Sequence, residues 1–184
     1  TINDGKKERK FTTLQQLKIY TDSFMMYSQV NPSHSVSSFG VAYYIETDSG
    51  TVVEDVIYSA SDTSVGATPA SYNLEIKKNP DGYTQIIPSI PIQGQNMKLT
   101  EEYKFVGTKV TTPLDGVWKE TKSFIVKGND TVMNNRTQYK AFYSGYFMFG
   151  HTVTDSTSKI HTGMGFGTFE MAGNNKVKET DLNS

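Results

Sequence analysis

The feature that most constrains how this 184-residue chain folds is a pattern of residues that occurs twice. Residues 18–27 (KIYTDSFMMY) align without a gap on residues 140–149 (KAFYSGYFMF). Such self-similarity is the signature of a structural unit that is used more than once. Each copy starts with a strand, a tight turn and an aromatic strand, so the chain is predicted to build its sheet from a duplicated hairpin.

The match continues beyond the hairpin. After a loop that is longer in the second copy, residues 39–42 (FGVA) match residues 164–167 (MGFG), and Glu54 matches Glu179. Each copy thus adds a glycine-containing strand, a turn and a strand that carries a glutamate. The two predicted copies span about residues 14–60 and about residues 136–184.

The copies are incomplete in different ways. The segment before copy two, 113–120, has no counterpart before copy one, and the segment 58–110 has no counterpart after copy two. The chain is therefore predicted to be permuted relative to its own repeat, or to contain two incomplete units that share strands, within one molecule or across a homodimer. A length of 184 residues favours one domain, so residues 1–184 are expected to form a single β-barrel body with this internal repeat.

Composition favours strands throughout the chain. Tyr, Phe, Val and Thr are abundant, long stretches with a period of 3.6 residues are missing, and short runs alternate with turn residues such as those at 79–82 (NPDG). Pro88 and Pro91 must lie at a strand end or edge, because proline cannot donate to an interior ladder. The predicted strands are 14–21, 24–30, 38–46, 51–59, 72–77, 83–87, 97–106, 117–126, 138–143, 146–153, 160–171 and 176–180.

Charge and cysteine content exclude several classes of function. The net charge is −1 with scattered charges, so the chain lacks the basic face that nucleic acid requires. The charge run at 6–10 (KKERK) is expected to be a solvated end. Without cysteine there are no disulfides or thiolate sites, and no apolar stretch is long enough for a transmembrane helix.

The segment 114–119 (LDGVWK) resembles the Gly-x-Trp opening strand of lipocalins and related calycins. The strands that follow it, through the aromatic strand at 146–153 and the glycine strand at 163–169, resemble those of small lipocalin-like domains in secreted Bacteroidetes proteins. This resemblance implies an antiparallel β-barrel, export from the cytoplasm and an apolar ligand. Its Trp strand follows copy one instead of preceding it, which departs from the family pattern.

The same resemblance implies an extracytoplasmic location: periplasmic, secreted or on the cell surface as a lipoprotein. A first residue of Thr1 instead of Met is what removal of a leader sequence would leave, although a trimmed chain explains it equally well.

Aromatic strands with apolar residues on both faces are the candidate binding element. Such a strand lines a cavity on one face and meets a partner on the other, or it belongs to a filled core with a dimer face. The first alternative predicts a pocket of aromatic and Met side chains for a small hydrophobic ligand. The predicted ligand-binding residues are Phe24, Met26, Tyr27, Tyr43, Trp118, Tyr143, Phe147, Phe149 and Phe166.

Trp118 and the glycine strand also have structural explanations. Trp118 is expected to plug the bottom of the barrel if it does not touch ligand, and its indole N–H then needs a partner. Gly163, Gly165 and Gly167 leave one strand face without side chains, which indicates a sharp bend or the close approach of a ring.

Catalytic and metal chemistry have weak signals. Glu54 and Glu179 occupy the same repeat position and, facing a closed interior, could do acid–base work. His151 and His161 flank a loop near Asp155, but their spacing matches no common metal motif. We therefore predict no enzyme activity, no cofactor and no metal.

Three hypotheses follow. The first is a non-enzymatic, lipocalin-like binding protein for a small apolar ligand. The second is a structural or protein-interaction barrel with a packed core, and the third is a calycin-type enzyme that uses Glu54 or Glu179.

Overall fold

The computed structural model describes residues 1–184 except 12, 32–35, 49–50, 62–63, 66–69, 93, 108–109, 174 and 184. All its regular elements are β-strands, and every paired strand runs antiparallel to its neighbour. The prediction of an all-β, antiparallel fold is confirmed. His34 and the loop residues Gly66 and Pro69 lie outside the described residues.

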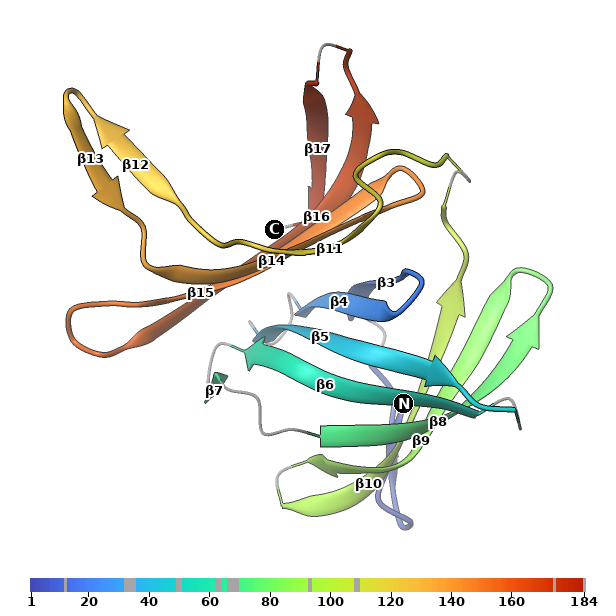
Figure 1. Ribbon diagram of the computed structural model, residues 1–184. Coiled ribbons are helices and arrows are strands. Elements are labelled where there is room, and N and C mark those ends of the chain that lie inside the picture. Colours follow the sequence, from blue (N-terminus) through green and yellow to red (C-terminus); the bar gives the residue numbers. More distant parts are fainter. Residues whose placement is uncertain are drawn as a thin grey trace.

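The larger sheet contains ten strands from the first part of the chain (Figure 1). Its order is β2-β1-β10-β9-β8-β6-β5-β4-β3, and β7 pairs with β6. These strands are β1 (Ile2–Asn3), β2 (Glu8–Arg9), β3 (Gln15–Tyr20), β4 (Phe24–Asn31), β5 (Val36–Glu46), β6 (Thr51–Ser61), β7 (Ser64–Val65), β8 (Ala70–Asn79), β9 (Gly82–Ile92) and β10 (Gln95–Lys104).

The smaller sheet contains five strands in the order β11-β14-β15-β16-β17. They are β11 (Gly116–Lys119), β14 (Arg136–Tyr143), β15 (Tyr146–Thr154), β16 (Ile160–Met171) and β17 (Val177–Asn183). A separate hairpin of β12 (Phe124–Lys127) and β13 (Asp130–Met133) projects from one side (Figure 1). The predicted strand 117–126 is therefore two strands in two different sheets.

The sheet arrangement differs from the predicted single closed barrel. The strands divide between two sheets, and in the described part of the chain no backbone ladder joins the β3 end of the larger sheet to its β10 side. The larger sheet instead curls until side chains of β3 touch those of β9 and β10, as the bond from Lys18 to Gln85 shows. Strands twist and coil, so a long sheet can bring its ends together without closing.

The two sheets pack face to face around one apolar core. Alternation along β3 sends Leu17 and Ile19 to the outer face of the curl, against the smaller sheet. Met26 and Phe39 from the larger sheet and Met148 from the smaller one are fully buried there. At the edge of this core the Tyr58 hydroxyl lies 2.6 Å from the Thr152 hydroxyl.

Glycines let rings lie close to strands, both in this core and on the opposite face of the smaller sheet. A Cβ built on Gly150 would lie 2.3 Å from the ring of Phe39, and one on Gly163 would lie 2.6 Å from the imidazole of His151. Of the two explanations for the glycine strand, the close approach of a ring is the one seen at Gly163, and at Gly167 a Cβ would meet both Phe147 and backbone.

The prolines of β9 lie where a missing N–H is tolerated. Among the described residues, the ladder between β8 and β9 covers residues 82–86 of β9 and ends before the first proline. Pro88 coincides with a register shift in the ladder with β10, and Pro91 lies one residue before the strand ends. The prediction that both lie at a strand edge or end is confirmed.

The strands β3–β6 and β14–β17 have the same sequential order and the same register. Lys18 pairs with Tyr27 across β3 and β4, and Lys140 pairs with Phe149 across β14 and β15. Glu54 lies opposite Tyr44, and Glu179 lies opposite Phe169. Both meanders also have a register shift at aligned positions, 41/42 and 166/167.

No helix that could cross a membrane occurs among the residues that the structure describes.

Candidate functional site

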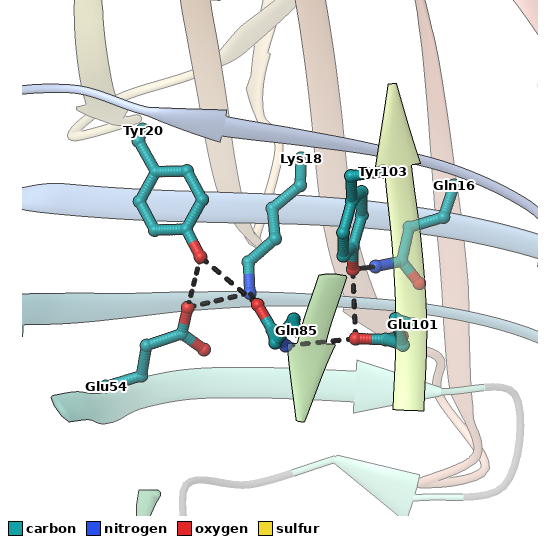
Figure 2. A network of polar contacts seen from close by, with 7 residues as sticks. All are labelled: Gln16, Lys18, Tyr20, Glu54, Gln85, Glu101 and Tyr103. Atoms are coloured by element: carbon teal, nitrogen blue, oxygen red, sulfur yellow. Dashed lines mark hydrogen bonds and ion pairs between the residues drawn. The ribbon is translucent and has the colours of Figure 1, made fainter. Parts of the chain in front are cut away.

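A polar network fills the inside of the curled sheet. Residues Gln16, Lys18 and Tyr20 alternate along β3, so all three project to the concave face. They meet side chains from β6, β9 and β10, namely Glu54, Gln85, Glu101 and Tyr103 (Figure 2). Four strands from three separate stretches of the chain thus contribute to one site.

The centre of the network is a buried ion pair. Lys18 Nζ lies 2.7 Å from Glu54 Oε1, and the two side chains are 3% and 4% exposed. The Tyr20 hydroxyl donates to the same carboxylate oxygen at 2.7 Å. A buried charge is stable only when it is paired and hydrogen-bonded, and this pair meets both conditions.

Gln85 links the ion pair to a second carboxylate. Its amide oxygen accepts from Lys18 at 2.9 Å, and its amide nitrogen donates to Glu101 at 3.0 Å. Glu101 also accepts from the Tyr103 hydroxyl at 3.0 Å, and Gln16 donates to that hydroxyl. Gln85 is 2% exposed, so its orientation is fixed by partners at both ends.

The phenols of the network keep their protons. Burial, with a further contribution from the Glu54 carboxylate, raises the pKa of Tyr20 well above its ordinary value of 10. Burial and the charge of Glu101 raise the pKa of Tyr103 in the same way. Both hydroxyls are therefore hydrogen-bond donors at neutral pH, and neither is a base.

A half-open cavity of about 1060 Å³, which we call the mouth cavity, lies above one end of the network. Gln16, Glu101 and Tyr103 belong to both the network and the cavity wall. The remaining wall comes from β1, β2, β4, the end of β9, β10 and the segment before β3. Its apolar residues are Ile2, Phe11, Leu14, Ile92 and Leu99, and its other residues are Thr1, Glu8, Lys10, Gln29, Thr100 and Glu102.

The mouth cavity carries an excess of negative charge. The charged residues of its wall are the glutamates Glu8, Glu101 and Glu102 and the lysine Lys10, and the amino group of Thr1 in the same wall donates to the Thr100 carbonyl. Glu101 accepts hydrogen bonds from two uncharged groups, and no cation lies in ion-pair distance of it among the described residues. This carboxylate can therefore take a further, charged donor.

A second cavity of about 630 Å³ lies between the segment 110–113 and the strands β16 and β17. Its wall includes Phe169, Met171 and Lys178. It shares no residue with the mouth cavity.

The nine predicted ligand-binding residues lie in different places, and none of them lines either cavity in the described part of the chain. Met26 is fully buried in the core between the sheets, and Phe24 and Phe166 pack against that core. Tyr27 lies in the curl beneath Gly40, where burial raises its pKa to about 12. Their role in binding stays a prediction.

The other predicted residues lie at the surface or on the far face of the smaller sheet, which is the face turned away from the core between the sheets. Tyr43 and Tyr143 are exposed. Phe147 is buried in a cluster on that far face, and Phe149 packs against it. Trp118 is 51% exposed and its indole N–H donates to the Leu114 carbonyl at 2.8 Å, so its expected place as a buried plug is wrong.

Both repeated glutamates are paired with repeated lysines. Lys140 Nζ lies 2.6 Å from Glu179 Oε1, just as Lys18 pairs with Glu54. The sequence alignment matched the lysines as well as the glutamates, which was a usable signal for a cross-strand ion pair. The hypothesis that Glu54 and Glu179 do acid–base work did not take the aligned lysines into account.

The histidines do not come together as a ligand set. His161 pairs with Asp155 at 2.8 Å, and His151 stacks on Phe149. The described residues contain no group of three or more His, Asp or Glu side chains that could hold a metal ion.

Sequence reasoning missed most of the site. Gln16, Gln85, Glu101 and Tyr103 were not singled out. The charge run at 6–10 is exposed, as predicted, but its contribution of Lys10 to a cavity wall was not foreseen. The available signal was alternation along two strands. Residues 83 and 85 of β9, and residues 101 and 103 of β10, put a polar and an aromatic side chain on one face of each strand.

Comparisons with protein-family models, curated proteins and solved structures found no match to this chain.

Proposed function

We propose that this chain is a non-enzymatic binding module that holds a small molecule in the mouth cavity. The ligand that fits best has a largely apolar body and one cationic group, such as an amine. The observation that carries the proposal is the continuity between an accessible cavity and a fixed polar network, through Gln16, Glu101 and Tyr103.

The size and wall of the cavity support a small ligand. Small-molecule sites typically enclose about 300–1,000 Å³ and combine apolar walls with a few placed polar groups. The mouth cavity is about 1060 Å³, with apolar side chains such as Phe11, Leu14 and Leu99 around a polar floor.

The charge of the cavity supports a cationic group on the ligand. The wall contains three glutamates against one lysine and the Thr1 amino group, and Glu101 receives only uncharged donors from the protein. An amine on the ligand would give Glu101 a charge-assisted hydrogen bond, which is roughly twice as strong as a neutral one.

The state of the network supports binding rather than catalysis. Tyr20 and Tyr103 retain their protons because burial raises the pKa of each phenol. Glu54 is held by Lys18 and Tyr20, and neither it nor Lys18 lines the mouth cavity. The network therefore orients polar atoms and keeps Glu101 in place for a ligand.

We also infer that β3–β6 and β14–β17 are two copies of one duplicated unit, because their registers, their bulges and their Lys–Glu pairs coincide. The likeness to lipocalins and export from the cytoplasm belong to the same proposal. They are supported by the 114–119 segment and by a curled sheet that opens at one end.

The test uses two related dyes. Dansylcadaverine joins an aromatic body to a primary amine, and its N-acetyl derivative is the same body without the charge. Saturable binding of dansylcadaverine near one per chain is expected, with weaker binding of the acetylated dye. Since a hydrogen bond to a charged group contributes about 1.5–3 kcal/mol, Glu101→Gln should weaken dansylcadaverine binding roughly tenfold to a hundredfold.

The matched control is Glu75→Gln, an exposed carboxylate of β8 outside the cavity wall. It should leave both affinities unchanged, and Glu101→Gln should leave the acetylated dye unaffected. Circular dichroism of each variant shows that it is folded. No saturable binding, or equal effects of the two variants, would overturn the proposal.

A further inference from the structure

The far face of the smaller sheet is the counterpart of the network-lined face of the curl, but it is covered less completely. Lys140 and Glu179 lie there as Lys18 and Glu54 lie inside the curl. The buried pair is 3% and 4% exposed, whereas the pair on the far face is 27% and 33% exposed. The difference arises because β8, β9 and β10 cover the first pair, whereas Leu114 and the segment before it cover the aromatic cluster of the second face and leave its ion pair partly exposed.

The edges of the two meanders differ in the same way. The outer edge of β6 is occupied by β8, which places Leu74 opposite Val52, Tyr72 opposite Glu54 and Ala70 opposite Val56. β17 holds the same place in the smaller sheet, and no strand of the described chain pairs with its outer edge (Figure 1). A bare edge strand is a template for pairing with another polypeptide.

We propose that the outer edge of β17 binds an antiparallel β-strand of another protein. Main-chain hydrogen bonds to a sheet edge provide affinity in this mode, and alternate side chains provide specificity. The added strand takes the place that β8 takes on β6, so it continues the sheet and covers the Lys140–Glu179 pair.

The side chains of β17 on the far face set the chemistry of the partner. By their pairing with β16, the side chains of β17 on this face are Val177, Glu179 and Asp181. A strand running antiparallel to β17 meets Asp181 first, then Glu179 and then Val177. The partner strand that fits best therefore has a basic residue opposite Asp181, a tyrosine or basic residue opposite Glu179, and an apolar residue opposite Val177. One residue separates each of these positions from the next.

The contacts behind this edge suit such a strand. Lys140 lies 5.1 Å from the ring centroids of both Phe142 and Phe147, so the face is an aromatic floor with one ion pair at its rim. Phe149 packs on the same cluster. Leu114 already covers part of this cluster, so a partner strand would add contacts beside the cluster, along β17.

A second copy of this chain is a poor occupant. Antiparallel self-pairing of β17 about a two-fold axis normal to the sheet places residues of the same face opposite each other. The central registers then bring Glu179 against Asp181, Glu179 against Glu179, or Asp181 against Asp181. Like charges directly opposite one another destabilise a strand pair, so the partner has a different sequence.

The experiment uses a peptide built on the strand that covers the equivalent face. The probe is residues 70–79 with Ala70→Lys, which puts a lysine opposite Asp181, a tyrosine opposite Glu179 and a leucine opposite Val177. A scrambled peptide of the same composition is its control. Fluorescence anisotropy should show saturable binding of the probe and none of the scrambled peptide. The bound probe should slow amide hydrogen exchange in β17 at least about tenfold.

Two charge-reversal variants locate the binding. Asp181→Lys should weaken the probe at least about tenfold by placing like charges opposite each other. Asp130→Lys, on the exposed β12–β13 hairpin, should have no effect. The proposal fails if the probe does not bind, if both variants behave alike, if exchange in β17 is unchanged, or if β17 is already protected in a dimer of this chain detected by sedimentation. The dye test of the mouth cavity is independent of each of these outcomes.

Discussion

Removing Lys18 should destabilise the fold far more than removing its aligned counterpart Lys140. Both lysines pair with a glutamate at 2.6–2.7 Å, but the Lys18 pair is almost fully buried and the Lys140 pair is about one-third exposed. Lys18→Met leaves the Glu54 carboxylate buried without a cation. Breaking a buried pair in this way costs about 3–5 kcal/mol, whereas an exposed pair contributes about 0–1 kcal/mol.

The comparison is made by urea unfolding of Lys18→Met and Lys140→Met. With a slope of about 2 kcal/mol per molar urea, the first variant should lower the midpoint by roughly 2 M, and the second by less than about 0.5 M. A domain has about 5–15 kcal/mol in total, so the first loss is a large fraction of it. Both variants remove the same atoms, so side-chain propensity cancels.

A double variant identifies the cause. Lys18→Met combined with Glu54→Gln removes the orphaned charge and should recover part of the lost stability, since the penalty comes mainly from the unpaired carboxylate. Equal midpoint shifts for the two single lysine variants would refute the reasoning, because burial would then have no effect on the strength of the pair.

Two further predictions concern packing and pH. Gly150→Ala should lower the free energy of unfolding by about 1–3 kcal/mol, because its Cβ would lie 2.3 Å from the fully buried ring of Phe39. Gly163→Ala, whose neighbour His151 can move, should cost less by the same urea assay, and the reverse order would contradict the packing argument. The Arg136 guanidinium lowers the pKa of Glu120 below 4.5 through hydrogen bonds of 2.7 and 2.8 Å. The ion pair stabilises the fold fully above the ordinary pKa of Glu120, and this stabilisation is lost as the pH falls through the lowered pKa of the folded protein. Arg136→Gln should therefore flatten the acid limb of a plot of unfolding midpoint against pH. Superimposable acid limbs for the wild-type protein and the variant would show that the pair is not responsible.

Much of the fold could be predicted from alternation and turn residues. Eleven of the predicted strands, from 14–21 to 176–180, match strands of the structure to within a few residues at most ends. Local pattern is informative here because each strand is half-buried and its turns contain glycine, asparagine or aspartate. The split of 117–126 was missed because both halves have good strand composition, and only the sheet that each half joins separates them.

The candidate site was harder to predict, because it is made by long-range pairing. Nothing in the sequence near Gln85 states that a lysine of β3 will lie 2.9 Å from its amide. That contact depends on how far the larger sheet curls, which is a sum of small twists over many strands. The aromatic residues predicted as ligand contacts are instead spread over the core, the inside of the curl, the far face and the surface, since aromatic strands occur in all these places.

The core between the sheets also has a consequence for how the chain folds as it is synthesised. Its partners are distant in sequence: Ile19 and Tyr139, about 120 residues apart, belong to the same cluster. Until the second sheet emerges from the ribosome, the outer face of the first sheet presents Met26, Phe39 and Val41 to solvent. High contact order slows folding, so the nascent first half should be a natural client for chaperones that shield apolar surface.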